Sequence, residues 1–452
     1  MKRLSPWRKA VTVSLAGAIA SVCASSVALA EVTLVKSDGG WEFSTTGRLN
    51  SFLSWAKGDN MPVAPLSTNG TGPLYQFKSA GGTGVPDTPG SSDNIYGPDG
   101  MTVIGHTQGT VDAMRVRSGF VGNVLGFGLH RNLTETTRFT GVISIWSIVE
   151  SVDRRKYFPD YGDVREGYMK LEGNWGSFLA GKALTLFDRG ATEADFLYMH
   201  GYGLGYPGSI GVSGPAAGMI GFGVLASTFS GGFVYATPHI YGVQLSVGGY
   251  DPASLVGSRL ERTGAVRPEF ELTVDEALGT VGKVHLFFNG TWQKLYARQQ
   301  PDSFSATAEG VGFGGRVELG PVHLAAGGHT GKGLGLTFAL EPSESTYSDK
   351  SELRTSRGFF GIGQVVLAKF DVNLGFGQTK VVPLADDLVA NAMTGYPTYS
   401  LIYTQTGYFG AVVYHAADWL HFDADFMYAD FKWTAGDRQK ISFINAGTTV
   451  TW

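Results

Sequence analysis

The sequence predicts an all-β fold: a transmembrane antiparallel β-barrel of 16 strands, with short periplasmic turns and long external loops. Segments of about ten residues alternate between apolar and polar side chains and occur in pairs joined by tight turns. The turns at one end hold about two to five residues, whereas the connections at the other end include 57–110, 183–221, 330–356 and 378–405. A mean hydropathy of +0.01 fits a barrel, because its lipid face and its water face cancel.

The first 30 residues have the pattern of a cleaved signal peptide. Four basic residues precede an apolar stretch over residues 11–20, and an Ala-Leu-Ala sequence stands directly before Glu31. The apolar stretch is too short to span a membrane permanently, and no later apolar run of about 18 residues follows. We therefore expect export of the chain and a single barrel domain over residues 31–452, since a closed barrel needs every strand.

The only cysteine, Cys23, lies inside this signal peptide. Lipid attachment at Cys23 is an alternative, but Val22 is not the small residue that such a cleavage site requires. Removal of the signal peptide would leave no cysteine for a disulfide or a thiolate metal site.

Net charge argues against a nucleic-acid partner. The chain has 35 basic and 39 acidic residues, and removal of the four basic residues of the signal peptide leaves 31 basic residues and a net charge of −8. Its 65 glycines follow no collagen-like period and are scattered through alternating segments, which is typical of close-packed, curved strands.

The predicted strands follow one another along the whole chain. The first covers 43–55, and the second lies within 113–133. The others are 138–149, 164–172, 177–182, 229–238, 243–250, 268–275, 283–294, 312–319, 322–329, 359–367, 371–377, 406–415, 420–428 and the closing strand 440–452.

The closing strand has two distinct faces. Ile444, Ala446, Val450 and Trp452 lie on one face with Thr448, and smaller polar residues lie on the other, as a wall between lipid and water requires. Aromatic residues also stand near the ends of predicted strands, where interfacial girdles form. They are Trp55, Trp146, Tyr168, Trp175, Tyr250, Trp292, Tyr408, Trp419, Tyr428 and Trp452.

Several short motifs are distributed over these strands. They are Thr46-Gly47-Arg48-Leu49, the R-x-G-F-x-G segment from Arg117 to Gly122, residues 165–171, Gly181-Lys182, and Tyr235-x-Thr237-Pro238 with Gly242. In these motifs the chain resembles the sixteen-stranded trimeric general porin family of Gram-negative outer membranes. The similarity extends over residues 31–452, although each match is short.

The resemblance implies a constriction inside the barrel. In that family the loop after the fifth strand, here 183–221, folds inward, and its acidic residues face basic residues on the wall. The resemblance assigns Arg48, Arg117, Arg165 and Lys182 to the pore wall, and Asp188, Glu193 and Asp195 to the constriction loop. Opposed charges across a narrow aqueous gap create a transverse field that favours small polar solutes.

The sequence departs from the family in two places. The family's "PEFGG" signature is absent, so the choice among the three loop carboxylates stays open. Phe120 and Phe127 are both expected to face lipid but differ in parity, which predicts a bulge near residues 122–126. For each basic wall residue, an external position at a subunit contact or loop rim is the alternative.

No pattern predicts an enzyme or a cofactor. The nine histidines lack metal-ligand spacing, including His323 with His329 and His415 with His421. Residues 310–315 match G-x-G-x-x-G but open a predicted strand and precede no helix, and no G-x-S-x-G elbow occurs.

We therefore expect an outer-membrane porin for passive diffusion of small hydrophilic solutes and ions. The resemblance implies a homotrimer in the outer membrane of a Gram-negative bacterium, with the first and closing strands at the subunit contacts. Two alternatives stay open: a channel selective for one substrate, and a plugged barrel that acts as a surface-binding or structural protein.

Overall fold

The computed structural model describes residues 31–59, 93–96, 103–107, 110–119, 122–147, 149, 162–196, 218–253, 262–296, 305–340, 352–388, 402–434, 436 and 438–452. The predicted signal peptide, Cys23 and Phe120 lie outside these residues.

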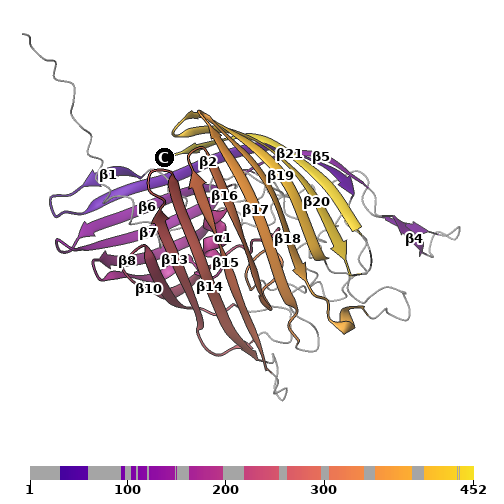
Figure 1. Cartoon of the computed structure of the whole chain (residues 1–452), viewed down its shortest axis with the longest axis horizontal. Helices are drawn as coiled ribbons and strands as arrows, with labels where there is room; N and C mark the ends of the chain where they lie inside the picture. Colours follow the sequence, from indigo (N-terminus) through magenta and orange to yellow (C-terminus); the bar gives the residue numbers. More distant parts are fainter. Residues whose placement is uncertain are drawn as a thin grey trace, which may run out of the picture.

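The strands form a closed antiparallel barrel of 16 spans, as predicted (Figure 1). The ring closes where β2 pairs with β21 on one side and with β5 and β6 on the other. Every barrel strand then pairs with its neighbours in ring order, so the sheet has no free lateral edge along these spans. The barrel strands are β2 (Glu42–Asp59), β5 (Thr110–Arg117), β6 (Asn123–Asn132), β7 (Thr137–Ser147), β8 (Asp163–Gly173), β9 (Gly176–Leu184), β10 (Phe229–Ala236), β11 (Val243–Tyr250), β13 (Arg267–Ala277), β14 (Gly282–Tyr296), β15 (Ser305–Leu319), β16 (Val322–Lys332), β17 (Thr355–Leu367), β18 (Phe370–Val381), β19 (Ile402–Ala417), β20 (Leu420–Trp433) and β21 (Arg438–Thr451).

The second span is interrupted, and so consists of two strands, β5 and β6. Gly122 has a φ of 68°, and the Asn50 side chain fills the gap by donating to the carbonyl of Gly122 at 2.6 Å and accepting from the N–H of Gly119 at 2.6 Å. Met114 and Val116 are exposed before the interruption, but Leu125 and Leu129 are exposed after it. The parity therefore changes between Val116 and Leu125, as the predicted bulge near residues 122–126 requires, although Phe120 itself lies outside the described residues.

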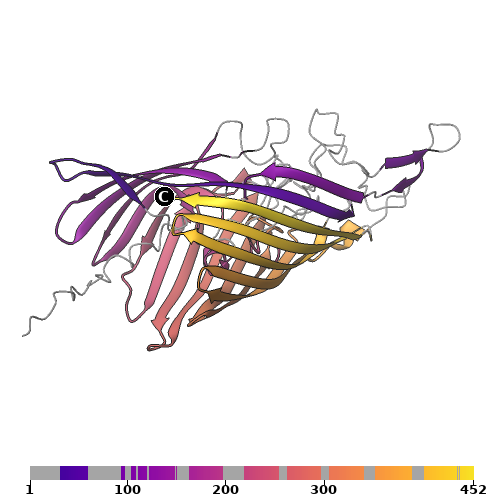
Figure 2. The ribbon, with the colours of Figure 1, turned by 90° about the horizontal axis from the view of Figure 1, so that it is seen from above.

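Several small elements were not predicted. β1 (Val32–Lys36) pairs with the start of β2, and Figure 2 shows this hairpin projecting beyond the C-terminus. β3 (Asp93–Tyr96) pairs with β4 (Val103–Thr107), and β12 (Arg262–Thr263) pairs with β14. The described part also has one α-helix, α1 (Arg189–Ala194), and a 3-10 helix, η3 (Ala385–Leu388). β15 starts at Ser305, so the G-x-G-x-x-G match lies within a strand and forms no nucleotide-binding loop.

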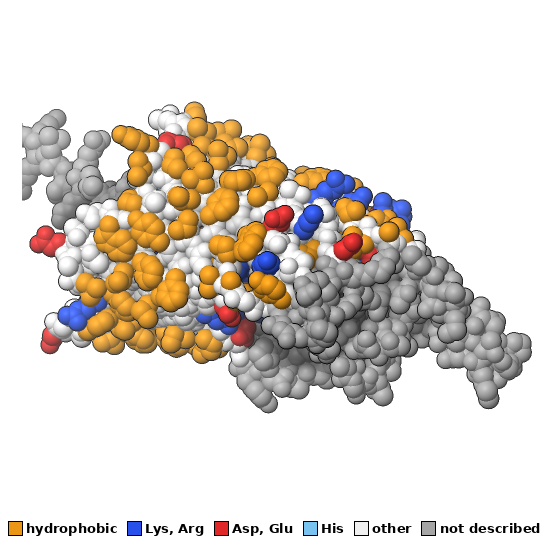
Figure 3. Space-filling view, turned by 90° about the horizontal axis from the view of Figure 1, so that it is seen from below, with side chains coloured by type: hydrophobic (Ala, Val, Ile, Leu, Met, Phe, Trp, Pro, Cys, Tyr) orange, Lys and Arg blue, Asp and Glu red, His pale blue; other side chains and the backbone are white. Residues whose placement is uncertain are grey.

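Side chains alternate between a lipid-facing and a lumen-facing wall. In β21, Ile444 is 45% exposed and Asn445 is 1% exposed, as the predicted faces of the closing strand require. Figure 3 shows one side of the molecule, where hydrophobic side chains cover a broad area and charged side chains gather toward its two ends. Within the described residues, no helix has the length and apolar character needed to cross a membrane.

Aromatic side chains form belts on the outer wall near both ends of the strands. Near the long loops, ring centroids are 5.7 Å apart for Phe359–Phe376, 4.9 Å for Phe376–Tyr408 and 6.4 Å for Tyr408–Tyr428. The belt at the turn end consists of Phe370, Tyr414 and Phe422.

The girdle prediction is wrong for three of its residues. The three residues are buried and lie on the lumen face: Trp146, Tyr168 and Tyr250. Each shares its face with a buried polar or charged residue, which are Ser144, Glu166 and Arg267 in the same order.

Candidate pore constriction

The segment after β9 leaves the wall and runs into the barrel. Its outgoing leg is described over residues 185–196, and its returning leg over residues 218–228. α1 packs against β14, β15 and β16 on the inner side of the ring (Figure 1). We call residues 185–228 the constriction loop. Residues of both legs have no exposed surface: Leu186, Phe187, Ala191, Ala194, Met219, Phe222, Val224 and Leu225. An external loop would be solvated, so this burial confirms the inward fold.

Two wall carboxylates on β13 hold the outgoing leg. Glu269 accepts a hydrogen bond from the N–H of Phe187 at 2.8 Å, and Glu271 accepts one from the N–H of Gly190 at 3.1 Å. Arg189 forms an ion pair with Glu271, and both side chains are about fully buried. The contact therefore joins an acidic wall to a basic loop residue, which is the reverse of the expected arrangement of charges.

The outgoing leg also needs a glycine where it meets this wall. A Cβ atom on Gly190 would overlap the ring of Phe287 from β14. Without a side chain, the loop backbone can approach near enough for its N–H to reach Glu271.

Asp188 joins the two legs of the loop. Its Oδ2 accepts a hydrogen bond from the N–H of Leu225 at 2.6 Å, and the side chain has no exposed surface. Burial raises the pKa of Asp188 to about 8, since it outweighs the hydrogen bond from Leu225, and nearby Glu271 adds to the rise. Asp188 therefore keeps its proton to higher pH than an exposed aspartate, and its carboxyl group is enclosed within the loop and does not reach the pore.

Asp195 has a similar position at the other end of α1. It is fully buried and accepts a hydrogen bond from the N–H of Met219 at 2.6 Å. A Cβ atom on Gly218 would overlap its carboxylate, and Gly218 has a φ of 55°. The sequence left open which of the three loop carboxylates points into the pore, and the structure uses those of Asp188 and Asp195 inside the loop.

Glu193 is the predicted loop carboxylate that reaches accessible space, with a side chain 24% exposed. Its Oε1 lies 3.9 Å from Nε of Arg189, one helical turn earlier. Arg316 on β15 is 30% exposed, and its Nη1 donates to the backbone carbonyl of Glu193 at 3.3 Å. Burial raises the pKa of Glu193 although Arg189 lowers it.

A second inward segment, residues 333–340 after β16, completes the constriction. The N–H of Ala226 donates to the carbonyl of Thr337 at 2.7 Å, and the N–H of Ala339 donates to the carbonyl of Ala226 at 2.9 Å. Gln405 on β19 donates to the carbonyls of Gly221 and Leu336, and so holds both segments. This contact was not predicted, because the connection 330–356 was expected to be external. The apolar run from Leu334 to Leu340 was the available signal.

The far wall is apolar where the returning leg meets it. Phe222 packs against Phe431 with ring centroids 6.0 Å apart. A Cβ atom on Gly377 or Gly407 would overlap this leg, so both glycines provide the space that it occupies. The buried lumen-facing side chains around it are Met427, Phe431, Trp433, Ile441 and Phe443.

The predicted basic residues have different environments. Arg48 is 1% exposed and lies on the lumen face of β2. Arg165 is 17% exposed, stacks on Trp146 at 4.8 Å and pairs with Asp163 at 3.0 Å. The backbone of Arg117 pairs with Phe52 in β2, and its side chain lies outside the described part.

Lys182 lies on the outer face, so the expectation that it lines the pore is wrong. It shares its parity with the exposed Phe178, and its Nζ donates to the carbonyl of Val164 at 2.8 Å. Its neighbours in the register are Gly167 and Gly231, which have no side chains, so the Lys182 side chain has room to lie along the outer wall.

Sequence reasoning missed other buried ionic residues. Arg267 pairs with Glu269 at 2.9 Å in the barrel wall, and Arg354, directly before β17, pairs with Asp387 of η3 at 2.7 Å. Near the turn end, buried carboxylates face the lumen, and their parity in the predicted strands could have identified them. They are Asp371, Asp423 and Asp425.

His415 and His421, whose spacing does not suit a metal site, face each other across a hairpin. Their Nδ1 atoms are 2.7 Å apart, and His415 also contacts Asp371 at 2.8 Å. In the part of the chain that the structure describes, no group of three or more His, Cys, Asp or Glu residues could hold a metal ion.

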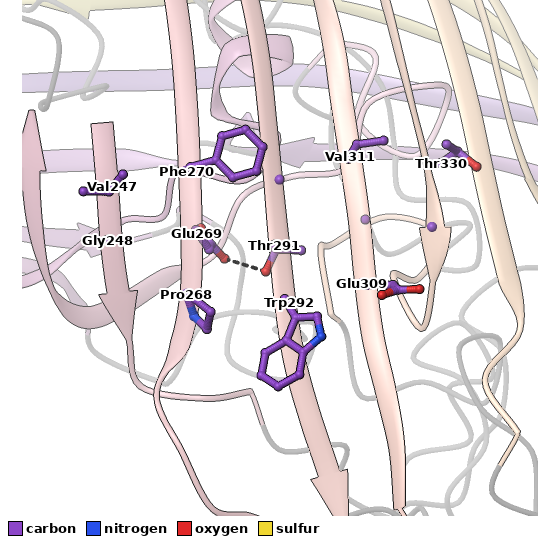
Figure 4. A pocket seen from close by; sticks show the side chains of 13 residues that line it. Val247, Gly248, Pro268, Glu269, Phe270, Thr291, Trp292, Glu309, Val311 and Thr330 are labelled. Carbon is purple, nitrogen blue, oxygen red and sulfur yellow. Dashed lines mark hydrogen bonds between the residues drawn. The ribbon is translucent and has the colours of Figure 1, made fainter. Parts of the chain in front are cut away.

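Two hollows lie outside the constriction. One, of about 540 Å³, is formed by the turns near Arg138, Glu172 and His239. The other, of about 660 Å³, is a groove that includes Phe270, Trp292, Val311 and Thr330 of the outer wall (Figure 4).

Comparison with protein-family models and with curated proteins finds no match. Solved structures, however, are similar. The outer membrane channel DcaP of Acinetobacter baumannii has a TM-score of 0.62 at 12% identity, over 93% of this chain and 100% of that chain. An anion-selective porin from Comamonas acidovorans has a TM-score of 0.55 at 8% identity, over 91% and 100%.

Salmonella typhi OmpF, solved in complex with daunomycin, has a TM-score of 0.53 at 11% identity, over 93% of this chain and 100% of that chain. At these identities the likeness concerns the fold. The chain has the sixteen-stranded barrel fold of Gram-negative outer-membrane porins.

Proposed function

We propose that the protein is an outer-membrane channel through which small hydrophilic solutes and ions diffuse passively. One observation carries this proposal: a loop enters the lumen of a closed barrel, where Glu269 and Glu271 of β13 fix its outgoing leg and its returning leg packs on the far wall at Phe431. Such a loop narrows the path through the barrel and excludes larger solutes by size. Two of the similar structures, an outer membrane channel and an anion-selective porin, support the same function.

Electrostatic selection would arise where charged side chains reach accessible space. Among the residues predicted for the site, these are Arg165 and Glu193, and Arg316 joins them. Arg48 would act at longer range because it is buried. With Asp188 and Asp195 used inside the loop, we expect a weaker transverse field than three loop carboxylates would give.

Single-channel recording in planar bilayers tests the proposal. We expect stepwise conductance that falls when neutral polymers small enough to enter the pore are added, and recovers with larger polymers. The polymer size at which conductance recovers gives the radius of the constriction. A folded, inserted barrel without any conductance would contradict a diffusion channel and favour a plugged barrel with a surface-binding or structural role.

A channel selective for one substrate is the second candidate. The double closure by the constriction loop and residues 333–340 favours it, because a constriction built from two segments leaves less room than one built from a single loop. Saturable block of the conductance by one class of solute, such as sugars or inorganic anions, would distinguish it from a general pore.

We also propose a homotrimer in the outer membrane, as the family resemblance implies, with the first strands, from β2 on, and the closing strand β21 at the subunit contacts. Chemical crosslinking in intact outer membranes tests this assembly. Crosslinked species that end at the trimer would support it, and a monomer alone would contradict it.

A further inference from the structure

Basic side chains form a row across the outer wall at its long-loop end. In the register of the sheet, Arg357 on β17 stands directly opposite Lys380 on β18, and Lys432 on β20 stands directly opposite Arg438 on β21. Thr404 on β19 joins the two pairs, because it stands opposite both lysines. The row therefore crosses five adjacent strands.

This arrangement is unfavourable without an external counter-charge. Like charges directly opposite each other in antiparallel strands destabilise the pair. Arg438 has a partner in Asp430, but Arg357, Lys380 and Lys432 form no ion pair with any residue that the structure describes. Arg357 and Lys432 are exposed, and Lys380 is half-buried. Three cationic groups are thus available on one side of the barrel.

The aromatic belt places this row at the depth of lipid headgroups. Phe359 follows Arg357 by two residues on the same face, and Phe376 and Tyr428 precede Lys380 and Lys432 by four. At about 3.4 Å per residue, the charges lie roughly 7–14 Å beyond the belt. Aromatic belts mark the interface, so the row lies among the headgroups of the outer leaflet.

The outer groove continues from the same row. Thr330 lines the groove and stands opposite Arg357 in the register. Gly290 forms part of the bottom of the groove. A side chain at this position would fill the groove, because a Cβ atom on Gly290 would come within 2.6 Å of the ring of Phe270. Trp292 and Val311 flank this floor, and the apolar lining fits a hydrocarbon chain (Figure 4).

The groove adjoins the cationic row within the register of the sheet. Gly290 stands opposite Val311, Val311 opposite Thr330, and Thr330 opposite Arg357. The groove therefore lies directly beside the row, on its β14 side, within reach of a lipid whose headgroup binds there. Two carboxylates line the groove: Glu309 stands opposite Lys332 in the register, and Glu269 is buried and accepts hydrogen bonds from Phe187 and Thr291.

We propose that this outer face binds an anionic lipid, with its phosphate on Arg357, Lys380 and Lys432 and an acyl chain in the groove near Trp292. Arginine can hold phosphate oxygens with two parallel hydrogen bonds, and the lysines add point charges. Lys380 and Lys432 are two strands apart, about 10 Å, so a lipid with two phosphate groups can use both parts of the row. The site belongs to the membrane face and does not depend on the channel function.

Quenching by brominated lipids tests the proposal directly. The refolded protein is placed in phosphatidylcholine vesicles that contain either brominated phosphatidic acid or brominated phosphatidylcholine. Tryptophan quenching then gives the relative binding constant of the two lipids. We expect a preference for phosphatidic acid, and we expect Trp292→Phe to remove part of the quenching because Trp292 lies in the groove.

Charge variants identify the headgroup site. Lys380→Gln and the double variant Arg357→Gln with Lys380→Gln should lower the preference by about fivefold for each lost charge. Lys369→Gln is the matched control, because Lys369 is exposed at the turn between the same two strands at the opposite end. It should leave the preference unchanged. A gel shift on heating confirms that every variant is folded.

Three results would overturn the proposal. They are equal quenching of the natural sequence by both lipids, an equal loss in the Lys369→Gln control, and displacement of the lipid by an equal concentration of inorganic phosphate. The last result would indicate a site for free anions.

Discussion

The carboxylate of Asp188 accepts a hydrogen bond from the backbone N–H of Leu225 at 2.6 Å, so a single side chain joins the two legs of the constriction loop. The outgoing leg of the loop is thus joined to the returning leg as well as to β13 in the wall. This connection explains why the acidic residue does not contribute charge to the pore.

Asp188→Asn should remove a pH dependence of stability. The pKa of Asp188 is raised from 3.8 to about 8 by burial, so above pH 4 the unfolded chain loses this proton while the folded chain keeps it. The free energy of unfolding therefore falls as pH rises toward 8, by up to about 1.4 kcal/mol per pH unit. Asparagine stays neutral and can still accept from Leu225.

Urea unfolding in lipid vesicles across this pH range measures the effect. Asp38→Asn, at an exposed residue of the β1–β2 hairpin, is the control and should retain the dependence. Identical pH profiles for Asp188→Asn and the natural sequence would show that the Asp188 carboxyl does not stay protonated.

Glu271→Ala should loosen the constriction loop. The change leaves Arg189 buried beside Glu193 without its wall partner and removes the acceptor of the Gly190 N–H. Loss of one partner of a buried ion pair weakens the contact by about 3 kcal/mol. We expect larger and noisier single-channel conductance. Glu276→Ala, at an exposed position of the same strand, should leave the conductance steps as they are.

Arg165→Ala should shift the pore toward cations. Arg165 is partly accessible, and one unit charge beside a narrow aqueous gap changes the local potential by about one kT. The ratio of cation to anion permeability, measured from the reversal potential in a salt gradient, should rise about threefold.

Asp163→Asn provides the opposite test, because it removes the acidic partner of Arg165 and should shift the ratio toward anions. Lys182→Ala is the control, since Lys182 lies on the outer wall. A shift of equal size in that control would show that the measured effect comes from the surface charge of the protein.

The barrel could be predicted from the sequence because the period of two is local. Residues 243–250 were predicted with their observed bounds, and the bulge near residues 122–126 was predicted from the difference in parity between Phe120 and Phe127. The same local rule could have placed Lys182 outside, since it shares parity with Phe178. Its assignment to the pore came from the family resemblance, which does not specify the direction of a side chain.

The constriction could be predicted only in part because its contacts are remote in sequence. Leu225 lies 37 residues after Asp188, and Glu271 lies 82 residues after Arg189. Whether a carboxylate points into the lumen or holds a backbone N–H depends on these contacts. No local pattern distinguishes the two roles. The inward position of residues 333–340 depends likewise on Gln405, 65 or more residues later in the chain.

Gln405→Ala should uncouple the two segments of the constriction. The side chain is fully buried, and its Nε2 donates to the carbonyl of Gly221 in the constriction loop and to that of Leu336 at 2.9 Å. Alanine leaves both buried carbonyls without this donor, which weakens the structure by about 1–3 kcal/mol. We expect brief additional open levels, because either segment can then move alone. Gln378→Ala is the matched control: Gln378 lies on the outer face of the neighbouring strand and donates to Thr406 at 2.9 Å. If both variants produce the same open levels, the two inward segments are not coupled through Gln405.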